Sequence, residues 1–280
     1  MKVGMNLLLW TAHVTDAHLP LCEKLKAAGF DGVEVPVHEG DVAHYRALGK
    51  RLDGIGLKRT VTTVLPGPQA DFISPDPASR RAALDYMRGA IDRSAALGAE
   101  VVAGPFYQPL ANFSGEPPTD DERGRAADGH RAAAEHAAKA GVLLTVEALN
   151  RFECYLLNTI ADAAAHVARV GHPSLKCMYD TFHANIEEKD PLGVIKAHYD
   201  AIGHVHISEN DRGTPGRGHA PLRETIRRFL SLGYQGWFTI EAFGRALPSV
   251  AAATRCWRDF FGSPEEVYTE GIALIRGAAK

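Results

Sequence analysis

The sequence predicts a single (β/α)₈ TIM barrel, an α/β domain over residues 1–280 with an extra helix near its C-terminal end. Eight short apolar and β-branched runs alternate with longer stretches whose apolar residues recur at helical spacing. The length of 280 residues is close to the roughly 250 that such a barrel needs. A glycine also repeatedly separates a predicted helix from the next strand, as at Gly29, Gly98, Gly141 and Gly233. Glycine tolerates the left-handed turn through which a chain leaves a helix.

The eight predicted strands are short and apolar, as expected for parallel strands that are buried on both faces. In chain order they cover residues 3–9, 32–37, 57–65, 100–106, 142–149, 175–182, 202–208 and 237–243. An open doubly wound sheet is the alternative for the same alternation of strands and helices. A dinucleotide-binding sheet of that kind carries G-x-G-x-x-G after its first strand, and this chain does not. The strand number and the length therefore favour the barrel.

The predicted helices lie between these strands and have recognisable start and stop signals. In chain order they cover residues 16–28, 41–53, 77–97, 120–140, 159–170, 191–200, 221–232 and 249–261, followed by a terminal helix at 265–276. Asp76-Pro77 marks the start of the third helix, and Gly54 is the expected cap of the second. The segments 66–77 and 105–118, rich in Pro and Gly, are expected to be loops at the catalytic face and not domain boundaries.

Composition and charge exclude several classes of function. Apolar residues make up 45% of the chain and charged residues 23%, which is the mix of an ordinary globular protein and excludes disorder as the main state. The net charge of −3 leaves no basic face, so no nucleic-acid partner is expected. No stretch is long enough to span a membrane, and the apolar run 3–10, broken by Gly4 and Asn6, is too short for a signal peptide. The four cysteines form no C-x-x-C pair, and we expect reduced thiols and a cytoplasmic location.

Four consecutive predicted strands carry an ionisable side chain near their C-terminal ends. These residues are Glu147, Asp180, His206 and Glu241, on strands five to eight. Active sites of such barrels lie at this end, where three carboxylates would repel one another without a cation between them. Three carboxylates with one imidazole suit Mn²⁺, Mg²⁺ or Co²⁺ better than a metal that prefers thiolates. Taken singly, each carboxylate could instead cap a helix or pair with an arginine, and His206 could be a hydrogen-bonded core histidine.

Three further polar residues follow these strands closely. Glu153 lies in the loop after strand five, His183 shortly after Asp180, and Arg212 in the loop after strand seven. Their structural alternatives are a solvated loop carboxylate, a residue in the first turn of a helix, and a surface ion pair. The glycine-rich segment 213–218 could bind phosphate, but it does not match G-x-x-x-x-G-K-[ST]. A tight loop that brings Arg212 inward explains these glycines equally well.

The motifs around these residues resemble those of a known enzyme family. They are residues 147–153 (EALNRFE) with 157–159 (LNT), 180–188 (DTFHANIEE), 206–212 and 241–243 (EAF). Over essentially the whole chain, the sequence is similar to the ketose 3-epimerases, the D-tagatose 3-epimerase and D-allulose (psicose) 3-epimerase family of xylose-isomerase-like TIM barrels. The resemblance implies that Glu147, Asp180, His206 and Glu241 bind one divalent ion, usually Mn²⁺. It further implies that Glu147 and Glu241 form the acid/base pair. By the same resemblance, the O1–O2 end of the sugar would be bound by Glu153, His183 and Arg212, and the chain would form a homodimer or homotetramer.

The expected activity is therefore metal-dependent epimerisation of free ketoses at C3, by deprotonation and reprotonation through an enediolate. The sugar pair would be of the D-tagatose/D-sorbose, D-fructose/D-allulose or L-ribulose/L-xylulose type. An aldose–ketose isomerase of the same barrel superfamily is the main alternative; a nuclease and a non-catalytic sugar-binding barrel are others. The chain departs from the family at Asn6 or a neighbouring leucine, at Thr62 or Thr63, and at Asn210-Asp211. The resemblance puts these positions in the distal half of the sugar pocket, where they would affect which ketose is preferred.

Overall fold

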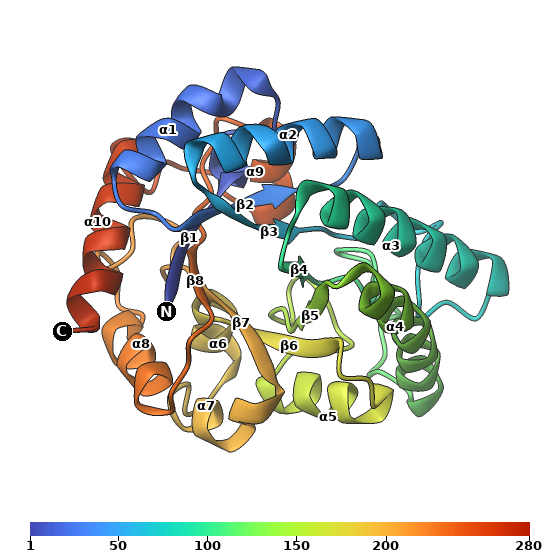
Figure 1. Cartoon of the computed structure of the whole chain (residues 1–280). Coiled ribbons are helices and arrows are strands. Elements are labelled where there is room, and N and C mark those ends of the chain that lie inside the picture. Colours follow the sequence, from blue (N-terminus) through green and yellow to red (C-terminus); the bar gives the residue numbers. More distant parts are fainter.

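The computed structural model describes all 280 residues and has a closed barrel of eight parallel strands, joined in the order of the sequence (Figure 1). The strands are β1 (Lys2–Asn6), β2 (Gly32–Pro36), β3 (Lys58–Thr62), β4 (Val101–Gly104), β5 (Leu143–Glu147), β6 (Leu175–Asp180), β7 (Ile202–Ile207) and β8 (Trp237–Ile240). The barrel closes where β1 pairs with β8, with Val3 opposite Phe238. The predicted (β/α)₈ fold is thereby confirmed.

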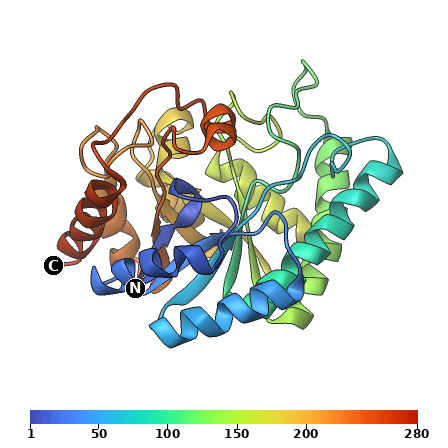
Figure 2. The same ribbon diagram turned by 90° about the horizontal axis from the view of Figure 1, so that it is seen from above.

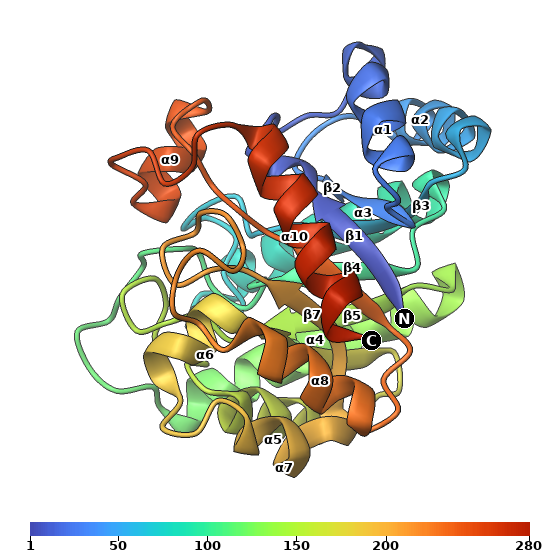
Figure 3. The ribbon, with the colours of Figure 1, turned by 90° about the vertical axis from the view of Figure 1, so that its left-hand side faces the viewer.

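Ten α-helices accompany the strands, and most of them form the outer ring of the barrel (Figure 1). They are α1 (Leu19–Ala27), α2 (Val42–Ile55), α3 (Pro77–Leu97), α4 (Asp120–Ala140), α5 (Ile160–Val170), α6 (Thr181–Glu187), α7 (Gly193–His198), α8 (Leu222–Ser231), α9 (Pro248–Thr254) and α10 (Pro264–Ala278). The expected terminal helix is α10, which packs against α8, β1 and β8 (Figure 3). None of these helices combines the length and the apolar character needed to cross a membrane.

Several predicted boundaries differ from those of the structure, each for a local reason. The first strand ends at Asn6 and not at residue 9, because Leu7–Leu9 form a 3₁₀ turn in which the Leu8 N–H donates to Asn6 Oδ1. The sixth strand ends at Asp180, whose carboxylate accepts the first backbone N–H groups of α6, a helix the sequence analysis did not separate. The second helix runs past Gly54 and is capped by Gly56, at φ +78°.

The helix predicted at 249–261 is shorter in the structure and ends at Thr254. Arg255, the residue after it, has a left-handed conformation with φ +60°, which stops the helix. This short helix, α9, lies among the loops that follow the strands, on the upper side of the barrel in Figure 2. The side chains of Ser249, Val250, Ala253 and Thr254 contribute to the cavity described below.

Alternate residues of each strand face outward and inward, and the two faces differ in character. Outward residues such as Val33, Val61 and Val205 join a core of 65 buried residues between the strands and the helices. Inside the barrel, a separate cluster of Val101, Ala103, Met178 and Trp237 is surrounded by polar side chains. The interior is tight near β1, since a Cβ atom on Gly4 would lie 2.8 Å from Thr239 Oγ1. The barrel interior is therefore partly polar, contrary to the expectation of strands that are apolar on both faces.

Candidate active site

The four residues predicted at the strand ends lie together at one end of the barrel. Glu147 ends β5, Asp180 ends β6, His206 lies near the end of β7, and Glu241 directly follows β8. All four side chains are buried. His206 Nδ1 lies 3.5 Å from Asp180 Oδ2 and 3.3 Å from Glu241 Oε1. Ligand atoms of Asp180, His206 and Glu241 lie within 4.8 Å of one another, and the same holds for Glu147, Asp180 and His183.

Two buried polar atoms of this group have no hydrogen-bond partner, namely Asp180 Oδ2 and His206 Nδ1. The other oxygen of Asp180 accepts the N–H groups of Phe182 and His183, and the other ring nitrogen of His206 lies 2.7 Å from Glu34 Oε1. Leaving a buried polar atom unpaired costs about 1–3 kcal/mol. A divalent cation next to Asp180 and His206 would satisfy both atoms and reduce the repulsion among the carboxylates. The residues therefore fit a buried metal site.

Glu147 and Glu241 have different electrostatic surroundings although they share one site. Burial and the neighbouring carboxylates of Asp180 and Glu241 raise the pKa of Glu147 well above its usual range. Burial also raises the pKa of Glu241, but the charges of His206 and Arg212 outweigh burial and leave that pKa lowered. In the protein alone, Glu147 therefore holds its proton more firmly than Glu241. Paired carboxyl groups with pKa values driven apart are typical of acid/base catalysis.

Arg212 reaches over this group from the loop after β7. Its Nη1 lies 2.6 Å from Glu241 Oε2, and its Nη2 lies 3.8 Å from Glu153 Oε1. The guanidinium group lies between the rings of Phe182 and Phe243, at 3.7 and 5.0 Å from their centroids. The backbone of Arg212 is in the left-handed region, at φ +66°. A planar cation held between two aromatic rings presents its N–H groups in one fixed direction.

His183 and Glu153 complete the polar side of the site. The backbone N–H of Asn150 donates to His183 Nδ1 over 3.0 Å, while Nε2 of the same ring lies 3.7 Å from Glu147 Oε1. Burial and the charge of Arg212 lower the pKa of His183 to about 3, so the ring is neutral, and its Nε2 lies 3.1 Å from Nη2 of Arg212. Glu153 Oε1 accepts a hydrogen bond of 2.8 Å from the side chain of Asn150. His183 and Arg212 thus each lie within 4 Å of one carboxyl group of the predicted acid/base pair, and Glu153 lines the same cavity.

A cavity of about 250 Å³ opens directly onto these side chains. Glu147, Glu153, His183, Arg212 and Glu241 line its polar part. The remaining lining is largely apolar and includes Leu8, Val64, Leu110, Leu149, Phe243 and Val250. A largely apolar cleft with a few convergent polar groups is the usual form of a binding site for a small molecule.

The positions that depart from the family lie mostly outside this cavity. Thr62 is part of its lining, as expected. Asn6 is buried behind the site, Thr63 donates to the carbonyl of Val37, and Asn210 accepts the N–H of His219. The expectation thus holds for Thr62, one of the two threonines considered, and for Leu8, a leucine near Asn6, whereas Asn6, Thr63 and Asn210 do not line this cavity.

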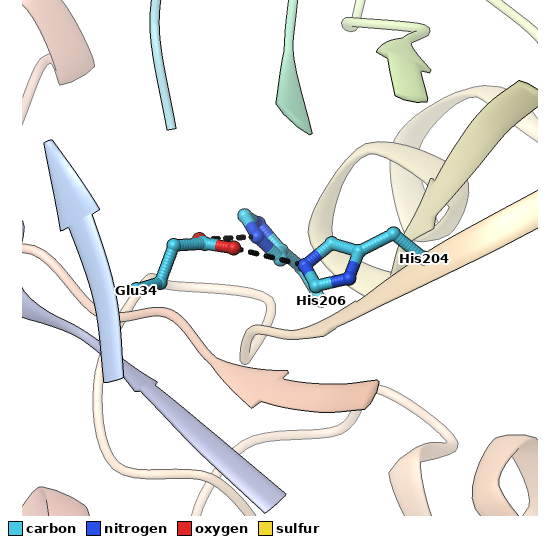
Figure 4. A group of neighbouring side chains, drawn as sticks. All are labelled: Glu34, His204 and His206. Carbon is cyan, nitrogen blue, oxygen red and sulfur yellow. Dashed lines mark hydrogen bonds and ion pairs between the residues drawn. The ribbon is translucent and has the colours of Figure 1, made fainter. Parts of the chain in front are cut away.

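Two residues that lie next to His206 were not predicted from the sequence, namely Glu34 on β2 and His204 on β7. Figure 4 shows the carboxylate of Glu34 facing the neighbouring rings of His204 and His206, which approach it from the opposite side of the barrel interior. An available signal was the acidic residue between Val33 and Val35 in an otherwise apolar strand. A second signal was the spacing of His204 and His206, which puts both rings on one face of β7.

The barrel fold agrees with comparisons to known proteins. The family description "xylose isomerase-like TIM barrel" matches residues 22–278. A probable ketose 3-epimerase of Synechocystis sp. is 32% identical over 99% of this chain and 96% of its own length. A D-psicose 3-epimerase of Ruminiclostridium cellulolyticum is 31% identical over 95% of this chain and 92% of its own. The crystal structure of a D-psicose 3-epimerase with D-tagatose, from Clostridium cellulolyticum H10, aligns with a TM-score of 0.89 at 28% identity, covering 100% of this chain and 98% of that one.

These matches assign the chain to a class of barrel and, within that class, to a family. The fold is that of the xylose isomerase-like TIM barrels, with a buried cluster of Glu, Asp and His side chains that could hold a metal ion. Within that class, the chain belongs to the ketose 3-epimerase family, whose members are isomerases that act on sugars.

Proposed function

We propose that this enzyme epimerises free ketoses at C3 with the help of one divalent cation. The observation that carries the proposal is the pair of buried carboxyl groups of Glu147 and Glu241, which line one cavity. They come from β5 and β8, which are separated in the barrel by β6 and β7. A small molecule between them would meet one carboxyl group on each of two sides. The relatives described as ketose 3-epimerases support this assignment.

Inversion at C3 requires that the hydrogen next to the C2 carbonyl leaves on one face and that a proton returns on the other. One carboxylate accepts the C3 proton while the other carboxyl group donates its own to the opposite face. Because the reaction is reversible, Glu147 and Glu241 exchange these roles between the two epimers. A cation held by Glu147, Asp180, His206 and Glu241 would supply positive charge that polarises the C2 oxygen.

The other polar residues would hold the reacting end of the sugar. The ring of His183 and the guanidinium of Arg212 face the carboxyl pair, where negative charge develops on oxygen as the C3 proton leaves. Donors that are already oriented stabilise such charge without reorganising during the reaction. The carboxylate of Glu153 accepts hydrogen bonds and is suited to a sugar hydroxyl group.

The substrates proposed are free ketoses of the D-tagatose, D-fructose or L-ribulose type. Mn²⁺ is the proposed metal, with Co²⁺ and Mg²⁺ as alternatives, because oxygen ligands outnumber the single imidazole. The largely apolar wall formed by Leu8, Val64 and Leu110 would face the end of the sugar remote from the carboxyl pair.

The test is to incubate the Mn²⁺-loaded protein separately with D-fructose, D-tagatose and L-ribulose and to identify the products by NMR. The proposal predicts that the C3 epimer of at least one ketose appears, and that metal-stripped protein forms none. An aldose as the main product would instead assign aldose–ketose isomerisation. Conversion of none of these ketoses would contradict the proposed substrate class.

A further inference from the structure

Glu34 is the most completely enclosed charged residue near the candidate metal site. It lies on β2, points into the barrel and has no exposed surface. Its Oε1 accepts from His206 Nε2 at 2.7 Å and from Asn6 Nδ2 at 3.1 Å. Its Oε2 accepts from His204 Nε2 at 2.9 Å and from Thr60 Oγ1 at 2.9 Å. Both oxygens are thus fully used, by donors from β1, β3 and β7, of which Figure 4 shows the two histidines of β7.

This arrangement determines which nitrogen of His206 faces the site. An ionised carboxylate can only accept hydrogen bonds, so the Nε2 atom that faces Glu34 must carry the proton. The lone pair of a neutral His206 ring is then on Nδ1, which is the atom near Asp180 and Glu241. Metal-binding histidines commonly have their second nitrogen fixed by a carboxylate in this way.

The same carboxylate is linked to Glu241 through Asn6. The amide oxygen of Asn6 accepts the N–H of Leu8, and this bond sets the orientation of the amide group. Its Nδ2 then has two hydrogens, and it lies 3.1 Å from Glu34 Oε1 and 3.1 Å from Glu241 Oε1. Asn6 therefore bridges a buried carboxylate and one of the proposed acid/base residues.

We propose that Glu34 is a positioning residue, which holds His206 as a ligand through Nδ1 and, through Asn6, holds the carboxylate of Glu241. The inference rests on the proposed function only in requiring that the cation binds at the cluster described above. Glu34 would not touch the cation or the sugar, because its oxygens are engaged by the four donors. His204 and Thr60 keep the carboxylate in place from the far side.

Glu34→Gln tests this role directly. Glutamine has nearly the same shape but only one acceptor oxygen, so its NH₂ group would face two of the four donors. We expect metal-stripped Glu34→Gln to bind Mn²⁺ about 10–100-fold more weakly than the unmodified chain in calorimetric titration. With Co²⁺ in place of Mn²⁺, the visible absorption bands, which report ligand geometry, should also change.

Thr60→Val is the matched control. It removes one hydrogen bond to the same carboxylate but leaves both contacts of Oε1, with His206 and Asn6, intact. Its Mn²⁺ affinity should stay within about threefold of the unmodified chain, an effect small beside the 10–100-fold loss above. An equal loss of affinity in Thr60→Val would overturn the proposal in favour of a general structural role.

Other outcomes separate this inference from the proposed function. A folded Glu34→Gln protein that binds Mn²⁺ as tightly as the unmodified chain would overturn the positioning role alone. Loss of one of two bound Mn²⁺ equivalents would also overturn it, because Glu34 would then be a ligand of a second ion. Failure of the unmodified chain to bind any divalent cation would refute the metal site itself. If Glu34→Gln does not fold, Glu34→Asp is the replacement variant, because its shorter side chain keeps the charge but moves it away from both histidines. Unchanged Mn²⁺ affinity in Glu34→Asp would also overturn the positioning role.

Discussion

The guanidinium of Arg212 lies 2.6 Å from the carboxylate of Glu241, measured from Nη1 to Oε2, and both groups line the same cavity. This contact joins the residue proposed to hold the sugar oxygens to one of the two residues proposed to move the C3 proton. Buried charges without partners are strongly destabilising, so the two side chains stabilise each other within the site. Together with the larger influence of His206, the charge of Arg212 outweighs burial, lowers the pKa of Glu241 and favours its ionised form.

Replacement of Arg212 by lysine should reduce activity although the charge is retained. Lysine lacks the planar fork of N–H groups and cannot stack in the same way between Phe182 and Phe243. We expect kcat/KM for the preferred ketose to fall about 10²-fold or more, the range for loss of an oriented donor. Steady-state kinetics check this result, with Arg217→Lys as control, since Arg217 is exposed and pairs with Glu270. Equal kinetics for the two variants would argue against the role given to Arg212.

Glu241→Gln should abolish most of the turnover. Glutamine fills the same space but cannot take up a proton, so one half of the acid/base pair is lost. The expected decrease in kcat is about 10²–10⁴-fold, the usual contribution of a general acid or base. The assay should be run at saturating Mn²⁺ with the bound metal measured, so that loss of metal is not mistaken for loss of the base. Glu270→Gln, on the exposed face of α10, is the control; activity of Glu241→Gln within tenfold of that control would count against the mechanism.

Removal of metal should lower both activity and stability. Without a cation, Asp180 Oδ2 and His206 Nδ1 are unpaired and the buried carboxylates repel one another. We expect treatment with EDTA to eliminate epimerisation, and added Mn²⁺ or Co²⁺ to restore it and to raise Tm, because a ligand that binds only the folded state stabilises it. Full activity in protein shown by metal analysis to be metal-free would refute the need for a cation.

Stability should also fall in mild acid because of a buried histidine pair, His130 and His166, that does not line the cavity. His130 Nδ1 lies 2.8 Å from His166 Nε2, and the other nitrogen of His130 contacts the carbonyl of Phe106. Burial lowers the pKa of His130 to about 4 and also lowers the pKa of His166. In the unfolded chain, histidines have ordinary pKa values near 6.5, so between about pH 6.5 and pH 4 the unfolded chain binds more protons than the folded protein. The free energy of unfolding therefore decreases as the pH falls from about 6.5 toward 4.

For His130 alone, the loss between pH 7.5 and pH 5 is about 2 kcal/mol. Urea unfolding at several pH values should show a weaker pH dependence for His130→Gln than for the unmodified protein. His136→Gln is a suitable control, since His136 is partly exposed and paired with Asp92. If His130→Gln and the unmodified protein lose stability in parallel, the buried pair is not the cause.

The sequence alone predicted the barrel and the four strand-end residues because both depend on local patterns. Hydrophobic runs of strand length recur eight times, and an ionisable residue at the end of a buried strand stands out against its apolar neighbours. The proximity of Glu147, Asp180, His206 and Glu241 followed from the rule that parallel strands of one barrel end on the same side.

Glu34, His204 and the second role of Asn6 were not predicted, for a physical reason. The barrel interior was expected to be apolar, whereas hydrogen bonds across it, between β1, β2, β3 and β7, satisfy several buried polar side chains. Such pairings join residues up to 172 positions apart, and no local pattern of one strand specifies which distant side chain it meets. The end of α2 was missed by two residues, since Gly56 and not Gly54 adopts the left-handed conformation, and the end of α9 was missed by more, since that helix stops at Thr254.

The most direct test of the two-carboxylate mechanism is the fate of the C3 hydrogen. The Mn²⁺-loaded enzyme should be given its best ketose in D₂O, and the reaction should be stopped after a few percent conversion, with the product epimer analysed by NMR. A proton delivered by Glu147 or Glu241 comes from a carboxyl group that exchanges with solvent, so the account predicts deuterium at C3 of the product. A product that keeps the original C3 hydrogen would contradict it, because that hydrogen would then have been returned by the group that removed it.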